Sequence, residues 1–104
     1  MKRILILTAF CTAGVLASGT AAANADLAKS KNCLACHAMD KKVVGPAFKD
    51  VAAKYKGDAS AVAKLAAKVQ KGGAGVWGNV PMPPNPGVNE AEAKQLVEWV
   101  LTVK

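Results

Sequence analysis

A run of five residues, Cys33-Leu34-Ala35-Cys36-His37, constrains this chain more than any other part of its sequence. Two cysteines three positions apart lie on one face of a helical turn, so both thiols can react with the same planar molecule. The histidine that follows places an imidazole beneath that molecule, and it is the only histidine in the chain. This order of residues is the attachment signature of c-type haem, in which each thiol forms a thioether with a vinyl group of the ring.

Three other uses of such cysteines need different surroundings. A structural zinc site requires four cysteine or histidine ligands, and outside this run the chain offers only Cys11. A thioredoxin-like redox pair lies beside a βαβ pattern, and the sequence has no convincing strand. A simple disulfide between Cys33 and Cys36 leaves the adjoining His37 without a role. Haem attachment is therefore the interpretation that uses all three residues.

The N-terminus has the composition of a secretory signal peptide, which we expect over residues 1–23. Two basic residues at positions 2 and 3 precede a mostly apolar stretch at 4–16, and small residues follow. Two A-x-A sites predict cleavage after Ala23 or after Ala25, and the sequence does not decide between them. A retained membrane anchor is the alternative, but the apolar run is short for a span of about 20 residues. We expect a periplasmic domain at 24–104, because bacteria attach haem covalently outside the cytoplasmic membrane.

The exported chain of about 80 residues is large enough for one domain with a small core. Cores of this size are marginal without a staple or a cofactor, so a buried haem ring would supply apolar bulk. Of the 14 basic residues, 12 remain after Lys2 and Arg3 are removed, against 7 acidic residues. The resulting basic surface favours acidic partners or anionic membranes, and export argues against nucleic acid.

Hydrophobic periodicity predicts about four helices. The first is expected at 26–37, with the haem cysteines near its C-terminal end. The second follows Gly45-Pro46 and ends at Gly57. Its apolar face is spaced at i, i+3, i+4 and i+7 and consists of Phe48, Val51, Ala52 and Tyr55.

The third and fourth helices have clearer ends. Asp58 is the expected N-cap of the third, Gly72-Gly73 end it, and its outer side carries Lys64, Lys68 and Lys71. Asn89 is the expected N-cap of the fourth, and Glu92 three residues later completes a capping box. Trp99 flanks its inward face, which holds Ala93, Leu96, Val97, Val100 and Val103. The sequence therefore predicts a small all-α bundle folded round its cofactor.

The segment between the third and fourth helices contains Met82, which we expect to be the second iron ligand. Pro81 and Pro83 flank it and stiffen the backbone that carries its thioether. Methionine is otherwise an adaptable core residue, but this one belongs to no helical stripe. The rival is Met39, only two residues beyond His37, which would have to reach the opposite face of the ring. A neutral thioether raises the reduction potential, and two filled axial positions favour one-electron transfer over substrate turnover.

With these residues assembled, the chain resembles the small bacterial class I monohaem cytochromes c of the c-551/c-552 type. The resemblance runs from Leu27 to Trp99, and its specific blocks are Cys33 to His37, Val44-Gly45-Pro46-Ala47, Gly75-Val76-Trp77-Gly78 and Pro81-Met82-Pro83-Pro84. It implies the class I cytochrome c fold, with about four helices wrapped round one covalently attached haem c. It also implies thioethers at Cys33 and Cys36 and axial iron ligands at His37 and Met82.

The resemblance further implies three residues that support the haem. The Pro46 carbonyl is expected to accept a hydrogen bond from His37 and so to fix the ring, although Pro46 alone reads as a helix-start residue. The Trp77 indole N–H is expected to meet a haem propionate, with core packing as the alternative. The Asn85 side chain is expected near the methionine sulfur, with a simple turn as the alternative. Lys68 stands where some relatives have a propionate-binding arginine, and it lacks the planar fork of that residue.

These features together predict a soluble periplasmic electron carrier that is not an enzyme. It is expected to act as a monomer between a membrane quinol–cytochrome c reductase-type donor and a terminal oxidase or nitrite reductase-type acceptor, without stable membrane insertion. A haem peroxidase would need an open iron face and a distal acid–base group, and the only histidine is already used. A five-coordinate gas-binding or sensing protein would lack the distal methionine. A fixed subunit docked to one larger enzyme is the third alternative.

Overall fold

The computed structural model describes residues 20–104, which form four α-helices and one short 3₁₀ turn. In chain order these are α1 (Thr20–Ser30), η2 (Cys33–Ala35), α2 (Phe48–Lys54), α3 (Ala61–Lys71) and α4 (Glu90–Val100). No strand forms within this part of the chain, where the bridges His37–Lys42 and Gly73–Met82 are isolated. The all-α prediction is confirmed. The predicted signal peptide lies outside the described residues except for its last four, and α1 runs across both predicted cleavage sites.

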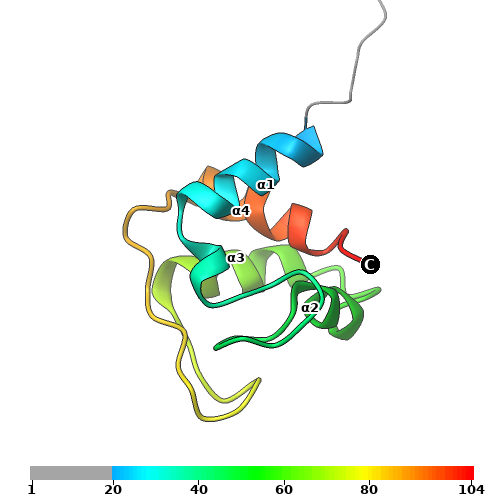
Figure 1. Ribbon diagram of the computed structural model, residues 1–104, viewed down its shortest axis with the longest axis vertical. Helices are drawn as coiled ribbons and strands as arrows, with labels where there is room; N and C mark the ends of the chain where they lie inside the picture. Colours follow the sequence, from blue (N-terminus) through cyan, green and yellow to red (C-terminus); the bar gives the residue numbers. More distant parts are fainter. Residues whose placement is uncertain (1–19) are drawn as a thin grey trace, which may run out of the picture.

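The C-terminal helix α4 is the centre of the packing, because α1, α2 and α3 all contact it (Figure 1). Its buried residues are Ala93, Leu96, Val97 and Trp99. The Trp99 ring meets Phe48 of α2 edge-on, at 5.5 Å between ring centroids, and Ala28 of α1 joins the same cluster. Val97 packs with Val51 and Leu65 on the side of α2 and α3. The predicted inward face of α4 is confirmed, with Val100 and Val103 partly buried at its edge.

The start of α4 follows from local chemistry. The Asn89 side chain accepts a hydrogen bond from the Glu92 N–H at 2.8 Å, and a Glu92 carboxylate oxygen accepts one from the Asn89 N–H at 3.1 Å. Two N–H groups that the helix leaves unpaired are satisfied in this way, as a capping box requires. The predicted capping box is confirmed. Gly72 is the C-cap of α3, so the predicted end of that helix is also confirmed. The end predicted for the second helix at Gly57 is wrong: α2 ends at Lys54, and Gly57, with a φ of 79°, lies in the turn that follows.

Three other predicted helix boundaries are wrong. The first helix begins at Thr20 instead of residue 26. The first helix ends at Ser30 instead of continuing to residue 37, because Asn32 adopts the left-handed conformation with φ 63°. Asparagine enters that region more readily than most residues, so the cysteines lie on a separate 3₁₀ turn. Asp58 is not the N-cap of α3, which begins at Ala61 with Ser60 at that position. Its carboxylate instead accepts hydrogen bonds from the N–H and the hydroxyl of Ser60, just before the helix.

Candidate haem-binding site

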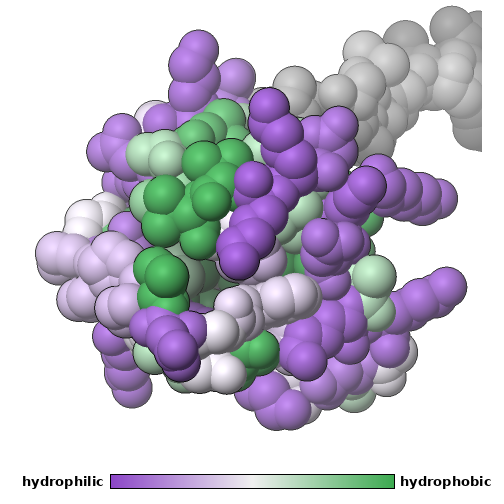
Figure 2. All heavy atoms as spheres, turned by 60° about the horizontal axis from the view of Figure 1, so that its bottom comes forward, coloured by the Kyte–Doolittle hydropathy of each residue, from purple (hydrophilic) through white to green (hydrophobic). Residues whose placement is uncertain are grey.

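One face of the molecule has an apolar hollow with walls from every part of the domain. The hollow contains about 1100 Å³ of space, part of it open to solvent. Figure 2 shows hydrophobic side chains gathered around it and hydrophilic ones outside them. Its lining includes Cys33, Cys36, His37, Val44, Phe48, Leu65, Val76, Trp77, Met82 and Leu96.

The cysteines reach the hollow from the 3₁₀ turn that follows the left-handed Asn32. The turn is closed by hydrogen bonds from the Cys36 and His37 N–H groups to the Cys33 carbonyl, at 3.3 and 3.0 Å. Both cysteines are half-buried free thiols, so within residues 20–104 no disulfide competes for them. Burial raises the pKa of the Cys33 thiol above its ordinary value. A neutral sulfur therefore suits this wall, and a thioether is neutral.

His37 is held in one orientation from three sides. Its Nδ1 lies 2.8 Å from the Pro46 carbonyl oxygen. Because a carbonyl can only accept, Nδ1 carries the proton and Nε2 keeps the lone pair that a metal needs. The ring stacks on Phe48 at 5.0 Å between centroids, with 22° between the planes. Gly45 lies against the imidazole so closely that an added Cβ would fall 2.4 Å from its Cε1 atom.

Met82 contributes to the hollow from residues 74–88, between α3 and α4, which we call the Met82 segment. This segment leaves the end of α3 and returns along one side of the molecule (Figure 1). Its backbone pairs with that of Gly73. The Met82 N–H donates to the Gly73 carbonyl at 2.7 Å, and the Gly73 N–H donates to the Met82 carbonyl at 3.0 Å. Met39, the rival ligand of the sequence analysis, is 43% exposed and does not belong to the lining of the hollow.

Trp77 and Lys68 line the hollow, and Lys54 lies over the Trp77 ring. Trp77 is 40% exposed and contributes to the lining, so it is not a buried core residue. The Lys54 Nζ lies 5.5 Å from the centroid of its ring, within range of a cation–π interaction. Lys68 also contributes to the lining, whereas Lys64 and Lys71 of the same helix are exposed. Two of the three lysines on the outer side of α3 are therefore exposed to solvent, and the third, Lys68, lines the hollow.

Asn85 makes its hydrogen bonds to backbone carbonyls. Its side-chain amide donates to the Val69 carbonyl at 2.8 Å and is 3.4 Å from the Pro83 carbonyl. These contacts tie the amide to the last turn of α3, whereas the resemblance placed it near the methionine sulfur. Asn85 therefore acts here as a link between the Met82 segment and α3.

The sequence analysis assigned no individual role to three residues that shape the site. Gly45 allows the close approach of His37, Phe48 supports the ring of His37, and Gly73 pairs with Met82. The glycine before Pro46 is the one feature of the sequence that could have indicated the close approach of Gly45 to His37. The other two roles depend on segments that meet only in the folded chain.

The residues around the hollow fit a covalently attached haem. Two thiols, a histidine with a fixed tautomer and a methionine all contribute to one apolar lining, and the ring of a haem requires such a lining. Among residues 20–104, no three or more His, Cys, Asp or Glu side chains form a group that could hold a metal ion. The described residues also include no helix long and apolar enough to cross a membrane.

Comparisons with known proteins agree with this chemistry. The family model described as Cytochrome c matches residues 21–104. The chain is 52% identical to cytochrome c-552 of Nitrosomonas europaea over 98 residues, which cover 94% of this chain and 95% of that protein. It is 50% identical to cytochrome c-551 of Pseudomonas aeruginosa over the full length of both chains. The crystal structure of wild-type Nitrosomonas europaea cytochrome c552 is similar with a TM-score of 0.75 and 56% identity, and covers 77% of this chain and 99% of that one.

Proposed function

This chain belongs to the cytochrome c family, and we propose that it is a soluble periplasmic one-electron carrier whose haem iron is bound by His37 and Met82. Its family carries one covalently attached c-type haem and transfers electrons instead of turning over a substrate. The proposal extends this to the individual residues, with thioethers at Cys33 and Cys36. The observation that carries it is that His37 and Met82, from segments on either side of α2 and α3, line the same apolar hollow as the two cysteines.

The haem supplies an iron that can gain or lose one electron, and the chain sets the conditions for that change. A neutral thioether from Met82 raises the reduction potential relative to a second imidazole. The hydrogen bond from His37 to Pro46 increases the basicity of the imidazole and prevents its rotation. Apolar walls keep water away from the iron. The ligands therefore need little rearrangement when the charge on the iron changes.

We propose that the indole N–H of Trp77, which lines the hollow with Lys54 above its ring, would meet a haem propionate. Lys68 contributes a further cation to the same lining. An indole N–H and ammonium groups are the donors that a carboxylate accepts. Asn85 links the Met82 segment to α3, and we propose that its side chain also lies near the Met82 sulfur, where an N–H group can tune the strength of the ligand.

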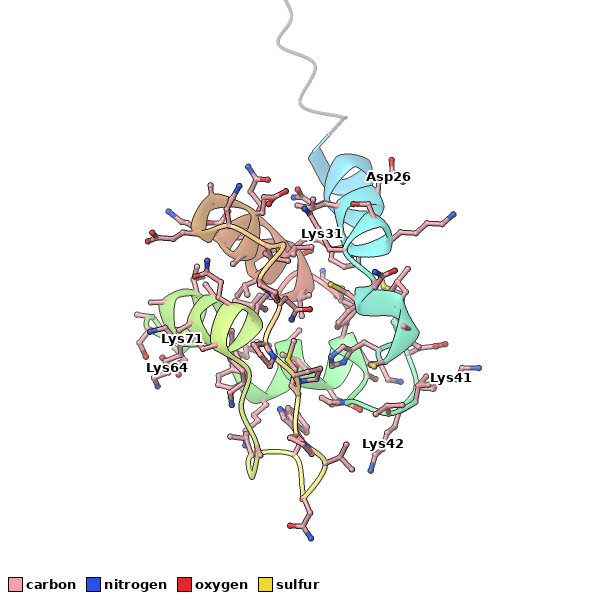
Figure 3. All side chains as sticks on the ribbon, turned by 90° about the vertical axis from the view of Figure 1, so that its left-hand side faces the viewer. Asp26, Lys31, Lys41, Lys42, Lys64 and Lys71 are labelled. Carbon is pink, nitrogen blue, oxygen red and sulfur yellow. The ribbon has the colours of Figure 1, made fainter. Side chains whose placement is uncertain are left out.

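We propose the localisation and the partners of the protein from its sequence. Cleavage after Ala23 or Ala25 would release the domain at 24–104 into the periplasm as a monomer. Its lysines point outward on opposite sides of the domain, with Lys41 and Lys42 on one side and Lys64 and Lys71 on the other (Figure 3). Such a distribution suits brief encounters with acidic surfaces. We propose a membrane quinol–cytochrome c reductase-type donor and a terminal oxidase or nitrite reductase-type acceptor.

The visible spectrum of the ferric holoprotein tests the ligand pair. Sulfur bound to ferric haem gives a weak charge-transfer band in the far red, and we expect this band in the parent and not in Met82→Ala. Met39→Ala is the matched control and should keep the band. Absence of the band from the parent, together with ready binding of carbon monoxide by the ferrous protein, would favour the five-coordinate gas-binding alternative.

A further inference from the structure

The C-terminal end of α3 is in direct contact with the backbone of the Met82 segment. The two N–H···O=C bonds between Gly73 and Met82 make one antiparallel bridge. They fix the peptide groups on both sides of the Met82 Cα, and therefore the point from which its side chain starts. Because Met82 lies between two prolines, its neighbours cannot donate backbone hydrogen bonds of their own. The bridge to Gly73 is thus the backbone attachment nearest to the sulfur.

Gly72 makes the close approach of these two segments possible. Its φ of 75° and ψ of −178° lie in a region that is essentially restricted to glycine. An added Cβ would fall 2.5 Å from the Met82 carbonyl oxygen, 2.9 Å from the Pro84 nitrogen and 3.1 Å from the Pro83 carbonyl carbon. All three atoms belong to the backbone, so no rotation of a side chain can relieve the overlap. Any side chain at position 72 would move the Met82 segment away from α3.

A second attachment lies at the other end of the same segment. The Asn85 N–H donates to the Gln70 carbonyl at 3.2 Å, and its side chain donates to the Val69 carbonyl at 2.8 Å. The Gln70 side chain in turn donates to the Val88 carbonyl at 3.3 Å. The last carbonyls of a helix have no partner inside the helix, so α3 offers them to the segment that carries Met82.

From these contacts we propose that the C-terminal end of α3, with Gly72 as its central element, positions Met82 for the iron. Gly72 is a positioning residue in this proposal and has no contact with the haem itself. The inference rests on the proposed function, in which Met82 is the axial ligand. It adds that the strength of the Met82–iron bond depends on the absence of a side chain at position 72.

The experiment measures how well imidazole competes with Met82 in the ferric holoprotein of Gly72→Ala. An added methyl group in a packed region produces overpacking, and displacement of Met82 should raise the affinity for imidazole by about tenfold or more. The far-red band should weaken in the same variant, and its reduction potential should fall because thioether ligation is partly lost. A change in global stability alone would produce none of these three effects in the folded protein.

Gly57 provides a matched control. It also has a positive φ, of 79°, but an added Cβ there meets nothing within 4 Å. Gly57→Ala should therefore keep the imidazole affinity of the parent. An unchanged affinity and band in folded Gly72→Ala, or an equal change in Gly57→Ala, would overturn the proposal.

If Gly72→Ala does not accumulate as holoprotein, Gln70→Ala provides the second test. It removes one link between α3 and the Met82 segment without adding any atom, and should raise the imidazole affinity by a smaller factor. An unchanged affinity in that variant would overturn the proposal. The parent distinguishes this failure from failure of the proposed ligand pair, because a parent that lacks the far-red band does not use Met82 at all.

Discussion

The contact between Gly45 and His37 leads to a sharp prediction for Gly45→Ala. The added Cβ would lie 2.4, 2.8 and 3.0 Å from the Cε1, Nδ1 and Nε2 atoms of the imidazole, well inside ordinary van der Waals contact. The ring cannot move aside freely, because it stacks on Phe48, which is only 5% exposed. Overpacking costs about 1–3 kcal/mol, and loss of the hydrogen bond to Pro46 costs about 0.5–1.5 kcal/mol more. We therefore expect the free energy of unfolding to fall by about 1.5–4.5 kcal/mol.

Guanidinium unfolding of the ferric holoprotein, followed by far-ultraviolet circular dichroism, measures this loss. Gly87→Ala is the control, because its added Cβ meets nothing within 4 Å and its φ is not positive. It should change the free energy of unfolding by no more than about 0.5 kcal/mol. A Gly45→Ala protein within that same range, with an unchanged absorption spectrum, would show that the close approach does not constrain His37.

Four further outcomes are expected. Asn89→Ala should lower the free energy of unfolding by about 1 kcal/mol in denaturant titration, because it removes one half of the capping box. The hydrogen bond from the Asn89 N–H, with the Lys31 ammonium 3.4 Å away, holds the pKa of Glu92 below its ordinary value. Its stabilising contribution is thus fully present above the unfolded pKa of about 4.3 and is lost as the pH falls through the lower folded pKa, so the stabilities of the parent and of Glu92→Gln should converge as the pH falls further. Electron transfer to an acidic physiological partner should slow as ionic strength rises, and rates that stay flat would exclude steering by the lysines. In hydrogen exchange, the amides of Gly73 and Met82 should exchange faster than that of Val97, because Val88 is the only buried residue among residues 72–88.

Local signals in the sequence predicted the parts of the fold that depend on neighbouring residues. The capping box of α4 needs only Asn89 and Glu92, three residues apart, and it forms as predicted. The end of α3 needs only a glycine in the right place. The first helix was predicted too long because the spacing of Cys33 and Cys36 also fits a helical turn. The left-handed φ of Asn32 separates that turn from α1. Hydrophobic periodicity cannot predict the backbone conformation of one residue.

The order of residues in the sequence was enough to select the residues of the candidate site. The five residues from Cys33 to His37 predict haem attachment and one proposed iron ligand, and a methionine between prolines suggests the other. The contacts of Asn85 were not predictable in the same way, because its amide chooses between carbonyls that only the folded chain brings together. Gly73 and Met82 pair through their backbones. The identity of the two residues therefore does not predict the pairing.

The two proposed iron ligands are held by different kinds of interaction, and this difference has a functional consequence. His37 rests on the buried Phe48 and so on the core formed with α4. Displacing it requires disruption of that core. Met82 is fixed by two backbone hydrogen bonds and a glycine contact, in a segment whose side chains are mostly exposed. We therefore expect small changes at the end of α3 to weaken the proposed Met82–iron bond and to lower the reduction potential, while the histidine and the fold stay as they are. Sequence variation in one segment would then tune the potential without disturbing the attachment of the haem.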